Sequence, residues 1–396
     1  MFEKLILRRS ESGIALTLGE IAEALLFYQS VHLVLDSRSI DSITKSLGMQ
    51  EFLALVRRRR LSAVYVSDML MAHSTNVGSI PHHGLVAGFL SGNANERPRT
   101  GRRALLELNL ERSGYSRGDA RKLAGQFIEL IPIKAYTSDH FVAGGILNSA
   151  KADLNDEAYV TGAVRHLLQD QVGFEAFADN LRVGIVHLDD GSFVIRSSID
   201  FVVGNVRRKQ MDPALEDFTE GHIVVALLDA NADVNIASHY GGDFYTSSTS
   251  SDIVRVRCSE LLRRTGISAS QLQQFRDIAL ADYPALREVI NSKERSFSEF
   301  ERLLDQSEKF RRSVHEMGPD ANLVEEYFKE SMRVGWMSSL PAKGIRFVLG
   351  LGISAVSPAV GAGCSAADAF LLDKLKGWRP NHFVDGKLKP FLDRDR

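Results

Sequence analysis

Runs of apolar residues in the first seventy positions follow the spacing of strands and helices that alternate. The pattern predicts strands at 2–9, 31–35 and 62–66 and helices at 17–28 and 40–58. Thr17 and Glu20 form a capping box, which marks the start of the first helix. Because a helix between two buried strands is the spacing of a βαβ unit, we expect a small, partly parallel sheet here.

The middle of the chain changes its pattern twice. Between 69 and 100 the periodicity disappears among glycines, prolines and polar residues, which predicts a long surface loop or lid and a candidate functional loop. Helical patterns then return over 101–113, 116–129, 138–153 and 155–171. Residues 183–203 carry the clearest hairpin signal, with a turn through Asp190 and Gly191.

After Pro213 the pattern is almost wholly helical. Helices are expected over 219–241, 253–265, 268–280, 283–291, 296–316 and 320–334. Residues 242–252 predict a polar connector, since two glycines end the helix before it.

The segment from Phe347 to Ala367 carries no charge. Ser357 and Pro358 divide it, because serine favours the N-cap and proline the first turn of a helix. Each arm is too short to cross a hydrocarbon core of roughly 30 Å, so we expect a buried, glycine-rich helical hairpin ending near Gly377. The alternative is an element at 344–376 that inserts into a membrane after a conformational release.

These elements predict an α+β fold. We expect a small α/β unit with a long loop at 1–100, a mixed helical region with a β-hairpin at 101–212, and a helical domain with the glycine-rich hairpin at 213–396.

Composition narrows the class of protein. The 396 residues are 44% hydrophobic and 25% charged, as in soluble globular proteins, and 48 Lys and Arg balance 50 Asp and Glu. Overall charge therefore gives no attraction to nucleic acid or anionic membranes. Two cysteines, Cys258 and Cys364, support neither a disulfide framework nor a thiolate zinc site, which favours the cytoplasm.

No cofactor is predicted. Two glycine motifs, at 350–355 and 361–366, come near the dinucleotide-binding fingerprint. That fingerprint needs a preceding strand and an acidic residue at the end of a second strand, and the sequence after 366 has no room for them. Close packing of helices through glycine explains both motifs better.

Asp36 and Asp68 are the most concrete catalytic candidates. Each follows an apolar run that predicts a parallel strand, and ligands in such sheets bind beyond the carboxyl ends of the strands. Two aspartates there would suit a divalent metal and phosphodiester cleavage. Residues 34–39 resemble the opening of PIN-type nucleases, but 69–74 lack the expected acidic partner, and aspartate after a strand is commonly a helix N-cap. No metal site is therefore predicted.

Histidines give a second set of candidates. His73 would act as an acid or base, and His82 and His83 would contribute to binding from the expected loop. No metal-binding spacing supports them, and adjacent residues seldom point the same way.

Two further clusters are binding candidates. The first is a polar and aromatic group near the expected connector, which equally suits a helix end followed by a linker: His239, Tyr240, Asp243 and Tyr245. The second is a basic run that would contact phosphate or simply complement a helix dipole: Arg57, Arg58, Arg59 and Arg60.

The leading functional interpretation is a cytosolic protein that binds another macromolecule, such as a sensor or effector in a bacterial stress or defence system. We expect a protein partner or a second copy, with nucleic acid as a weaker partner and a membrane only through 344–376. The alternatives are a metal-dependent nuclease using Asp36 and Asp68 and a membrane-perturbing effector.

Overall fold

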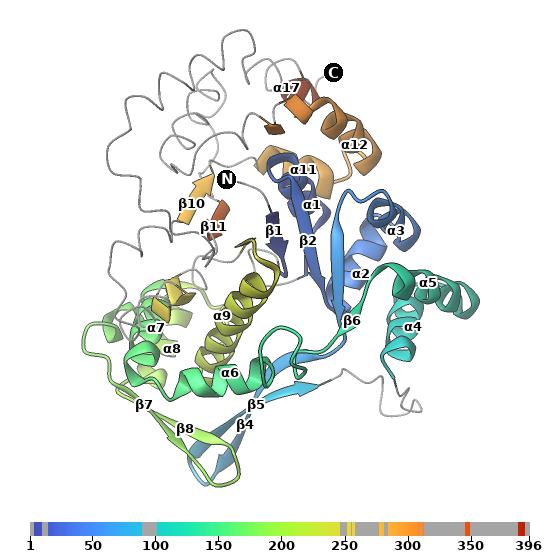
Figure 1. Cartoon of the computed structure of the whole chain (residues 1–396). Helices are drawn as coiled ribbons and strands as arrows, with labels where there is room; N and C mark the ends of the chain where they lie inside the picture. Colours follow the sequence, from blue (N-terminus) through green and yellow to red (C-terminus); the bar gives the residue numbers. More distant parts are fainter. Residues whose placement is uncertain are drawn as a thin grey trace, which may run out of the picture.

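The computed structural model describes residues 4–9, 15–88, 101–245, 252–254, 256–257, 277–280, 284–309, 311–312, 345–348 and 387–392. Within them the fold is α+β, as predicted: one mostly parallel sheet, one antiparallel sheet, and helices packed around both (Figure 1). None of the described helices is both long and apolar enough to cross a membrane.

The larger sheet combines strands from both ends of the chain. It contains β1 (Lys4–Leu7), β2 (Ser30–Leu35), β3 (Ser62–Val66), β6 (Ile133–Lys134), β9 (Asp243–Tyr245), β10 (Asp277–Leu280) and β11 (Ile345–Val348), in the order β10-β11-β9-β1-β2-β3-β6. The five strands from β9 to β6 are parallel, whereas β11 pairs antiparallel with β9 and β10. The βαβ prediction for the first seventy residues is confirmed.

One face of this sheet is covered by helices from the first and last thirds of the chain. They are α1 (Leu18–Phe27), α2 (Ser37–Ser46), α3 (Met49–Arg57), α4 (Arg102–Arg112), α5 (Arg117–Leu130), α11 (Pro284–Asn291), α12 (Phe297–Gln306) and the short α17 (Lys389–Leu392). Leu5, Leu33 and Tyr65 point into this layer from β1, β2 and β3 and are at most 1% exposed. Gly48, at φ 91°, divides the helix expected over 40–58 into α2 and α3.

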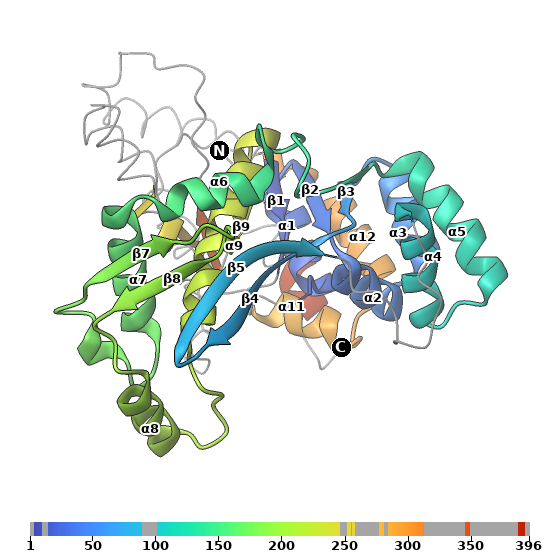
Figure 2. The same ribbon diagram turned by 90° about the horizontal axis from the view of Figure 1, so that it is seen from below.

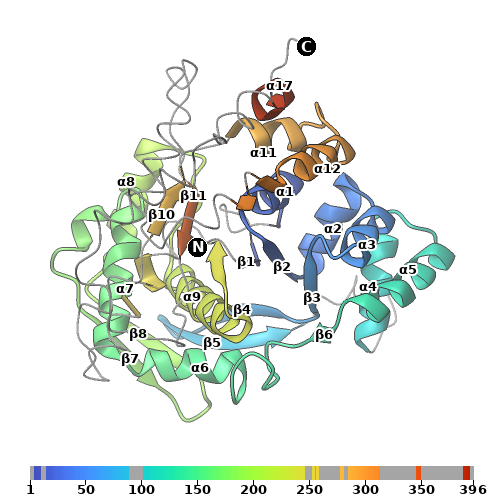
Figure 3. The same cartoon turned by 45° about the horizontal axis from the view of Figure 1, so that its top comes forward.

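The opposite face is covered mainly by α9 (Glu220–Tyr240), together with α6 (Gly145–Leu154), and α7 (Glu157–Asp170) packs against these two helices farther from the sheet (Figure 3). Ile6, Val34 and Val64 alternate with the residues of the first face and pack into this second core. The predicted start of α9 at Thr219 and its end at Gly241 are confirmed; Gly241 has the left-handed conformation that ends many helices.

A four-stranded antiparallel sheet lies beyond β3. Its strands are β4 (Met69–Val77), β5 (Ile80–Gly88), β7 (Val183–His187) and β8 (Phe193–Ser197), in the order β4-β5-β8-β7. The short helix η1 (Glu175–Phe177) and α8 (Phe201–Met211) flank it, and α8 projects away from both sheets (Figure 2). The hairpin expected from Val183 is confirmed, although α8 begins within its predicted range.

Several expectations are wrong where the structure describes the chain. Residues 69–88 form the β4–β5 hairpin and not a loop, 243–245 form β9 within the expected connector, and 277–280 form β10 and not a helix. The C-terminal region is also not wholly helical, because 345–348 form β11. Pairing with strands distant in sequence overrides the local pattern at β9, β10 and β11, whereas β4 and β5 pair with each other across a two-residue turn. The glycine-rich hairpin from 349 onward lies outside the described residues.

Candidate ligand site at the carboxyl edge of the parallel sheet

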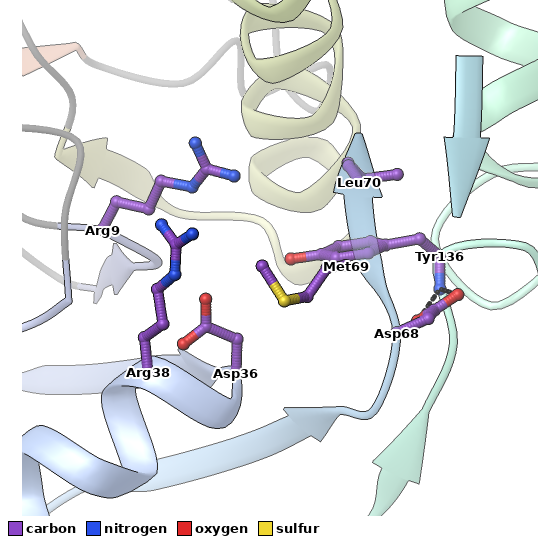
Figure 4. Close-up of a pocket in the computed structure, with 7 residues that line it drawn as sticks. All are labelled: Arg9, Asp36, Arg38, Asp68, Met69, Leu70 and Tyr136. Carbon is purple, nitrogen blue, oxygen red and sulfur yellow. Dashed lines mark hydrogen bonds between the residues drawn. The ribbon is translucent and has the colours of Figure 1, made fainter. Parts of the chain in front are cut away.

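The strand order reverses at β1, which has β2, β3 and β6 on one side and β9 on the other. Open α/β sheets bind ligands outside the carboxyl ends of their strands at such a reversal. A pocket lies at this edge, formed by residues that follow β1, β2, β3 and β6 (Figure 4). Its lining consists of Arg9, Asp36, Arg38, Asp68, Met69, Leu70 and Tyr136.

Asp36 is both a helix cap and a pocket residue. Its Oδ1 atom accepts a hydrogen bond from the backbone N–H of Ser39 at 2.7 Å, which fixes the first turn of α2. Arg38 extends from that turn and is exposed. Figure 4 shows the Arg9 and Arg38 side chains pointing the same way, with the Asp36 carboxylate beside them. Two guanidinium groups and a carboxylate therefore converge where β1 and β2 end.

The end of β1 is held by two carboxylates of α9. Nε of Arg8 lies 2.6 Å from Oδ1 of Asp233, and its NH2 group contacts Asp229 at 3.3 Å. Arg9 also pairs with Asp229, but its side chain remains 30% exposed while that of Arg8 is 5% exposed. Arg8 is thus a structural cation, whereas Arg9 keeps a surface directed at the pocket.

Burial and neighbouring charges shift the pKa values of Arg8, Asp233 and Tyr136. Burial lowers the pKa of Arg8, but Asp233, Tyr136 and Asp229 outweigh it and the pKa lies well above its usual value. Burial raises the pKa of Asp233, and Arg8 offsets only part of this effect. Burial also raises the pKa of Tyr136, whose hydroxyl therefore stays protonated at neutral pH.

Asp68 ties β3 to the segment after β6. Both carboxylate oxygens accept from the backbone N–H of Tyr136, at 2.9 and 3.1 Å, and the residue is 2% exposed. Asp36 and Asp68 do line one pocket, as the carboxyl-edge argument predicts, yet each has a structural role. Among the described residues no group of three His, Cys, Asp or Glu side chains has the arrangement of a metal site.

The three histidines of the β4–β5 hairpin lie on opposite faces. His73 is exposed and packs over Gly84, and His82 is opposite Thr75 on the same face. His83 points the other way and is 1% exposed. None of them lines the carboxyl-edge pocket.

A polar and aromatic cluster occupies the amino edge of the sheet. His239 and Tyr240, at the end of α9, lie beside His140, and the Tyr240 ring is 4.0 Å from that of His32. Lys4 donates a hydrogen bond to the Tyr240 carbonyl at 2.7 Å. Asp243 and Tyr245, the other two predicted members, belong to β9.

Burial is the main cause of the pKa shifts in this cluster. It lowers the pKa of His32 to about 4, with smaller contributions from Lys4, His239 and His140. It also lowers the pKa values of His140 and His239 and raises that of Tyr240 to about 12. The cluster is therefore a set of neutral rings at neutral pH, which favours packing over acid–base chemistry.

The basic run at 57–60 makes contacts within the protein. Arg57 ends α3, Arg58 pairs with Glu301 at 3.3 Å, and Arg60 pairs with Asp305. Both carboxylates belong to the α12 region, so half of the run links helices and is less available to phosphate.

The sequence did not single out several residues at or beside the carboxyl-edge pocket: Arg8, Arg9, Arg38, Asp229 and Tyr136. A signal for the first two existed, because Arg8 and Arg9 directly follow an apolar strand as Asp36 and Asp68 do. Asp229 and Asp233 are spaced i, i+4 on a largely apolar helix, which also indicates a buried partner. Nothing in the sequence distinguishes Tyr136.

No protein-family model matches the chain, and neither a curated protein nor a solved structure shows significant similarity to it.

Proposed function

We propose that this protein binds a small phosphorylated ligand carrying hydroxyl groups, of the nucleotide or sugar-phosphate class, at the carboxyl edge of the parallel sheet. The observation that carries the proposal is the convergence of Arg9 and Arg38 beside Asp36 at the reversal of strand order (Figure 4). Guanidinium groups match the planar geometry of phosphate oxygens, and a carboxylate accepts hydrogen bonds from sugar hydroxyls.

The charges at the pocket favour a ligand that carries both an anionic group and neutral hydrogen-bond donors. Two arginines and two aspartates line it, so a bare anion would leave the carboxylates opposed to its charge. Arg38 is the cation best placed to act on a ligand, because it is exposed and makes no ion pair within the part of the chain that the structure describes. A nucleotide would offer phosphate to Arg38 and Arg9 and hydroxyls to Asp36.

Calorimetric titration with ADP, adenosine and inorganic phosphate tests the proposal. We expect ADP to bind, adenosine to bind far more weakly, and affinity to fall with salt because the interaction is between charges. Arg38→Gln should weaken ADP binding roughly ten- to hundredfold, the size of a charge-assisted hydrogen bond. Arg121→Gln, an exposed arginine on α5, is the matched control. ADP binding that is absent, or equal in Arg38→Gln, would refute the proposal.

A second candidate function is self-association through α8, in keeping with the expected macromolecular partner. This helix buries only Gly204 and exposes four apolar side chains, with Val202 76% and Met211 69% exposed. Exposed apolar side chains on a projecting helix are typical of an interface, and a second copy can supply the same side chains about a twofold axis (Figure 2).

Light scattering after size-exclusion chromatography tests this second candidate. The wild-type chain should elute as a dimer at micromolar concentration, and the double variant Val202→Ser, Val206→Ser as a monomer of unchanged melting temperature. Val225→Ser, which alters an exposed valine of α9, should leave the dimer intact. If the wild-type chain elutes as a monomer, self-association through α8 is refuted.

A further inference from the structure

The β4–β5 hairpin and the start of α9 bring a serine, a histidine and a glutamate into one hydrogen-bonded chain. Oγ of Ser74 lies 2.7 Å from Nδ1 of His83, and Nε2 of His83 lies 2.7 Å from Oε2 of Glu220. Ser74 and His83 are directly opposite each other in the strand register. We propose that Ser74 is the nucleophile of a second site, separate from the carboxyl-edge pocket, that hydrolyses carboxylic esters.

The hydrogen bonds fix the direction in which a proton would move. A carboxylate only accepts, so the Nε2 atom of His83 carries the proton that bonds Glu220, and Nδ1 is the acceptor for the Ser74 hydroxyl. His83 is 1% exposed and packs against Phe193, with ring centroids 5.9 Å apart. Ser74 is exposed. A buried base therefore meets an accessible hydroxyl, which is the relation that nucleophilic catalysis requires.

The start of α9 provides the polar surroundings for a developing oxyanion. Gly221 is the second residue of α9, and a Cβ atom there would lie 3.6 Å from Oγ of Ser74 and 3.4 Å from Oγ1 of Thr219. The N–H of His222 donates to the Thr219 carbonyl at 3.0 Å, whereas the N–H groups of Glu220 and Gly221, the first two residues of α9, have no carbonyl partner within the helix, and the helix dipole favours negative charge at this end. The absence of a side chain at Gly221 leaves room for the acyl group next to Ser74.

The reaction balances without a cofactor. Oγ of Ser74 forms a bond to the ester carbon as its proton moves to Nδ1 of His83, and Glu220 stabilises the imidazolium that results. The bond to the alcohol breaks as the alcohol takes that proton. Water then attacks the acyl-serine, its proton passes to Nδ1 and on to Oγ, and the carboxylic acid leaves.

Two measurements on the full chain test the proposal. The first is labelling with a fluorophosphonate probe, with the labelled residue located by mass spectrometry of the peptides. The second is the rate of p-nitrophenyl acetate hydrolysis. We expect label on Ser74 in the wild type, none in Ser74→Ala, and turnover reduced at least about 100-fold in His83→Gln. Glu220→Gln should reduce turnover at least about tenfold, and Thr75→Ala, on the other face of β4, should have no effect.

Gly221→Ala separates catalysis from a purely structural role. The added methyl makes ordinary contacts and favours helix, so the melting temperature should stay equal or rise. It should nevertheless reduce labelling, because it occupies the space beside Ser74. A polar link that only joins the hairpin to α9 predicts the opposite: no label on Ser74 in any variant, with stability lost in Ser74→Ala. That result, or label on Ser74 that is unchanged in Glu220→Gln, would overturn the proposal.

Discussion

Nε of Arg8 donates a hydrogen bond to Oδ1 of Asp233 at 2.6 Å and so joins the end of β1 to the middle of α9. The two residues are 225 positions apart in sequence. The guanidinium interacts with the carboxylates of Asp229 and Asp233 and with the Tyr136 hydroxyl, and this arrangement keeps the neighbouring Arg9 beside the pocket. The shape of the carboxyl-edge pocket therefore depends on a buried ion pair outside it.

Replacing Arg8 should be costly for stability. Arg8→Met leaves the buried Asp233 without its closest cation, and loss of one partner of a buried pair destabilises by about 3–5 kcal/mol. Urea unfolding measures this change. Arg9→Met, at a half-buried site that shares Asp229, should have a clearly smaller effect.

The loss of stability in Arg8→Met should depend on pH. Burial already raises the pKa of Asp233, and removal of Arg8 raises it further. A carboxyl whose folded pKa exceeds its unfolded value loses stability as pH rises through that interval, so the variant should be least impaired near pH 4 and most impaired at neutral pH. A loss below about 1 kcal/mol, or one that does not change with pH, would contradict this account.

Because His32 is buried in its neutral form, the free energy of unfolding should decrease in acid. Its pKa is about 4 in the folded protein against 6.5 for an exposed histidine, so the unfolded chain takes up the proton first as pH falls. The stability is complete above pH 6.5 and decreases toward pH 4, by about 3 kcal/mol at most. In His32→Gln this part of the pH dependence should disappear in chemical unfolding at pH 7.5 and 4.5. His187→Gln controls for the loss of an exposed imidazole.

Gly204 should be intolerant of a side chain. A Cβ atom there would lie 2.3 Å from the Phe174 ring, which forms the surface on which α8 packs. Gly204→Ala should destabilise by about 1–3 kcal/mol, as overpacking does. Gly184→Ala in β7 adds a methyl where no atom lies within 4 Å and should change the melting temperature little. Equal melting temperatures for the two variants would show that α8 does not pack through Gly204.

Asp36 should separate helix capping from ligand binding. Asp36→Ala removes the acceptor for the Ser39 N–H and should cost about 1 kcal/mol in thermal unfolding. Asp36→Asn can still cap α2, so its stability should remain near wild type while binding of ADP changes through the lost charge. If Asp36→Asn is as unstable as Asp36→Ala, the carboxylate has a role beyond the cap.

Local signals predicted those elements whose ends are fixed by nearby residues. The boxes at Thr17 and Ser296 and the cap at Ser116 give helix starts within one residue of those observed, because capping involves residues only three positions apart. The turn at Gly191 similarly fixed the β7–β8 hairpin.

The β4–β5 hairpin was missed although it carries a turn signal. Gly78 and Ser79 form a two-residue turn between Val77 and Ile80, with Gly78 at φ 65°. Both flanking strands are largely exposed near the turn, so they lack the apolar alternation that marks a strand. β9, β10 and β11 are three or four residues long and are defined by pairing with distant partners, which no local pattern shows.

The candidate site was predicted in position but not in composition. The carboxyl-edge argument placed Asp36 and Asp68 together, and the structure does bring them to one pocket. Arg9 and Arg38 can be recognised as pocket residues only from the fold, because surface arginines are common and the convergence of these two depends on strand order. The hydrogen-bonded chain from Ser74 through His83 to Glu220 spans three elements, and no local pattern in the sequence indicates it.

The place of β11 between β9 and β10 has a consequence for how the protein is made. A ribosome must synthesise Ile345 before this strand can pair, so the edge of β9 stays open while residues 246–344 are made. Exposed strand edges recruit other chains. Newly made protein should therefore depend on chaperones until β11 emerges, and truncations before residue 345 should aggregate.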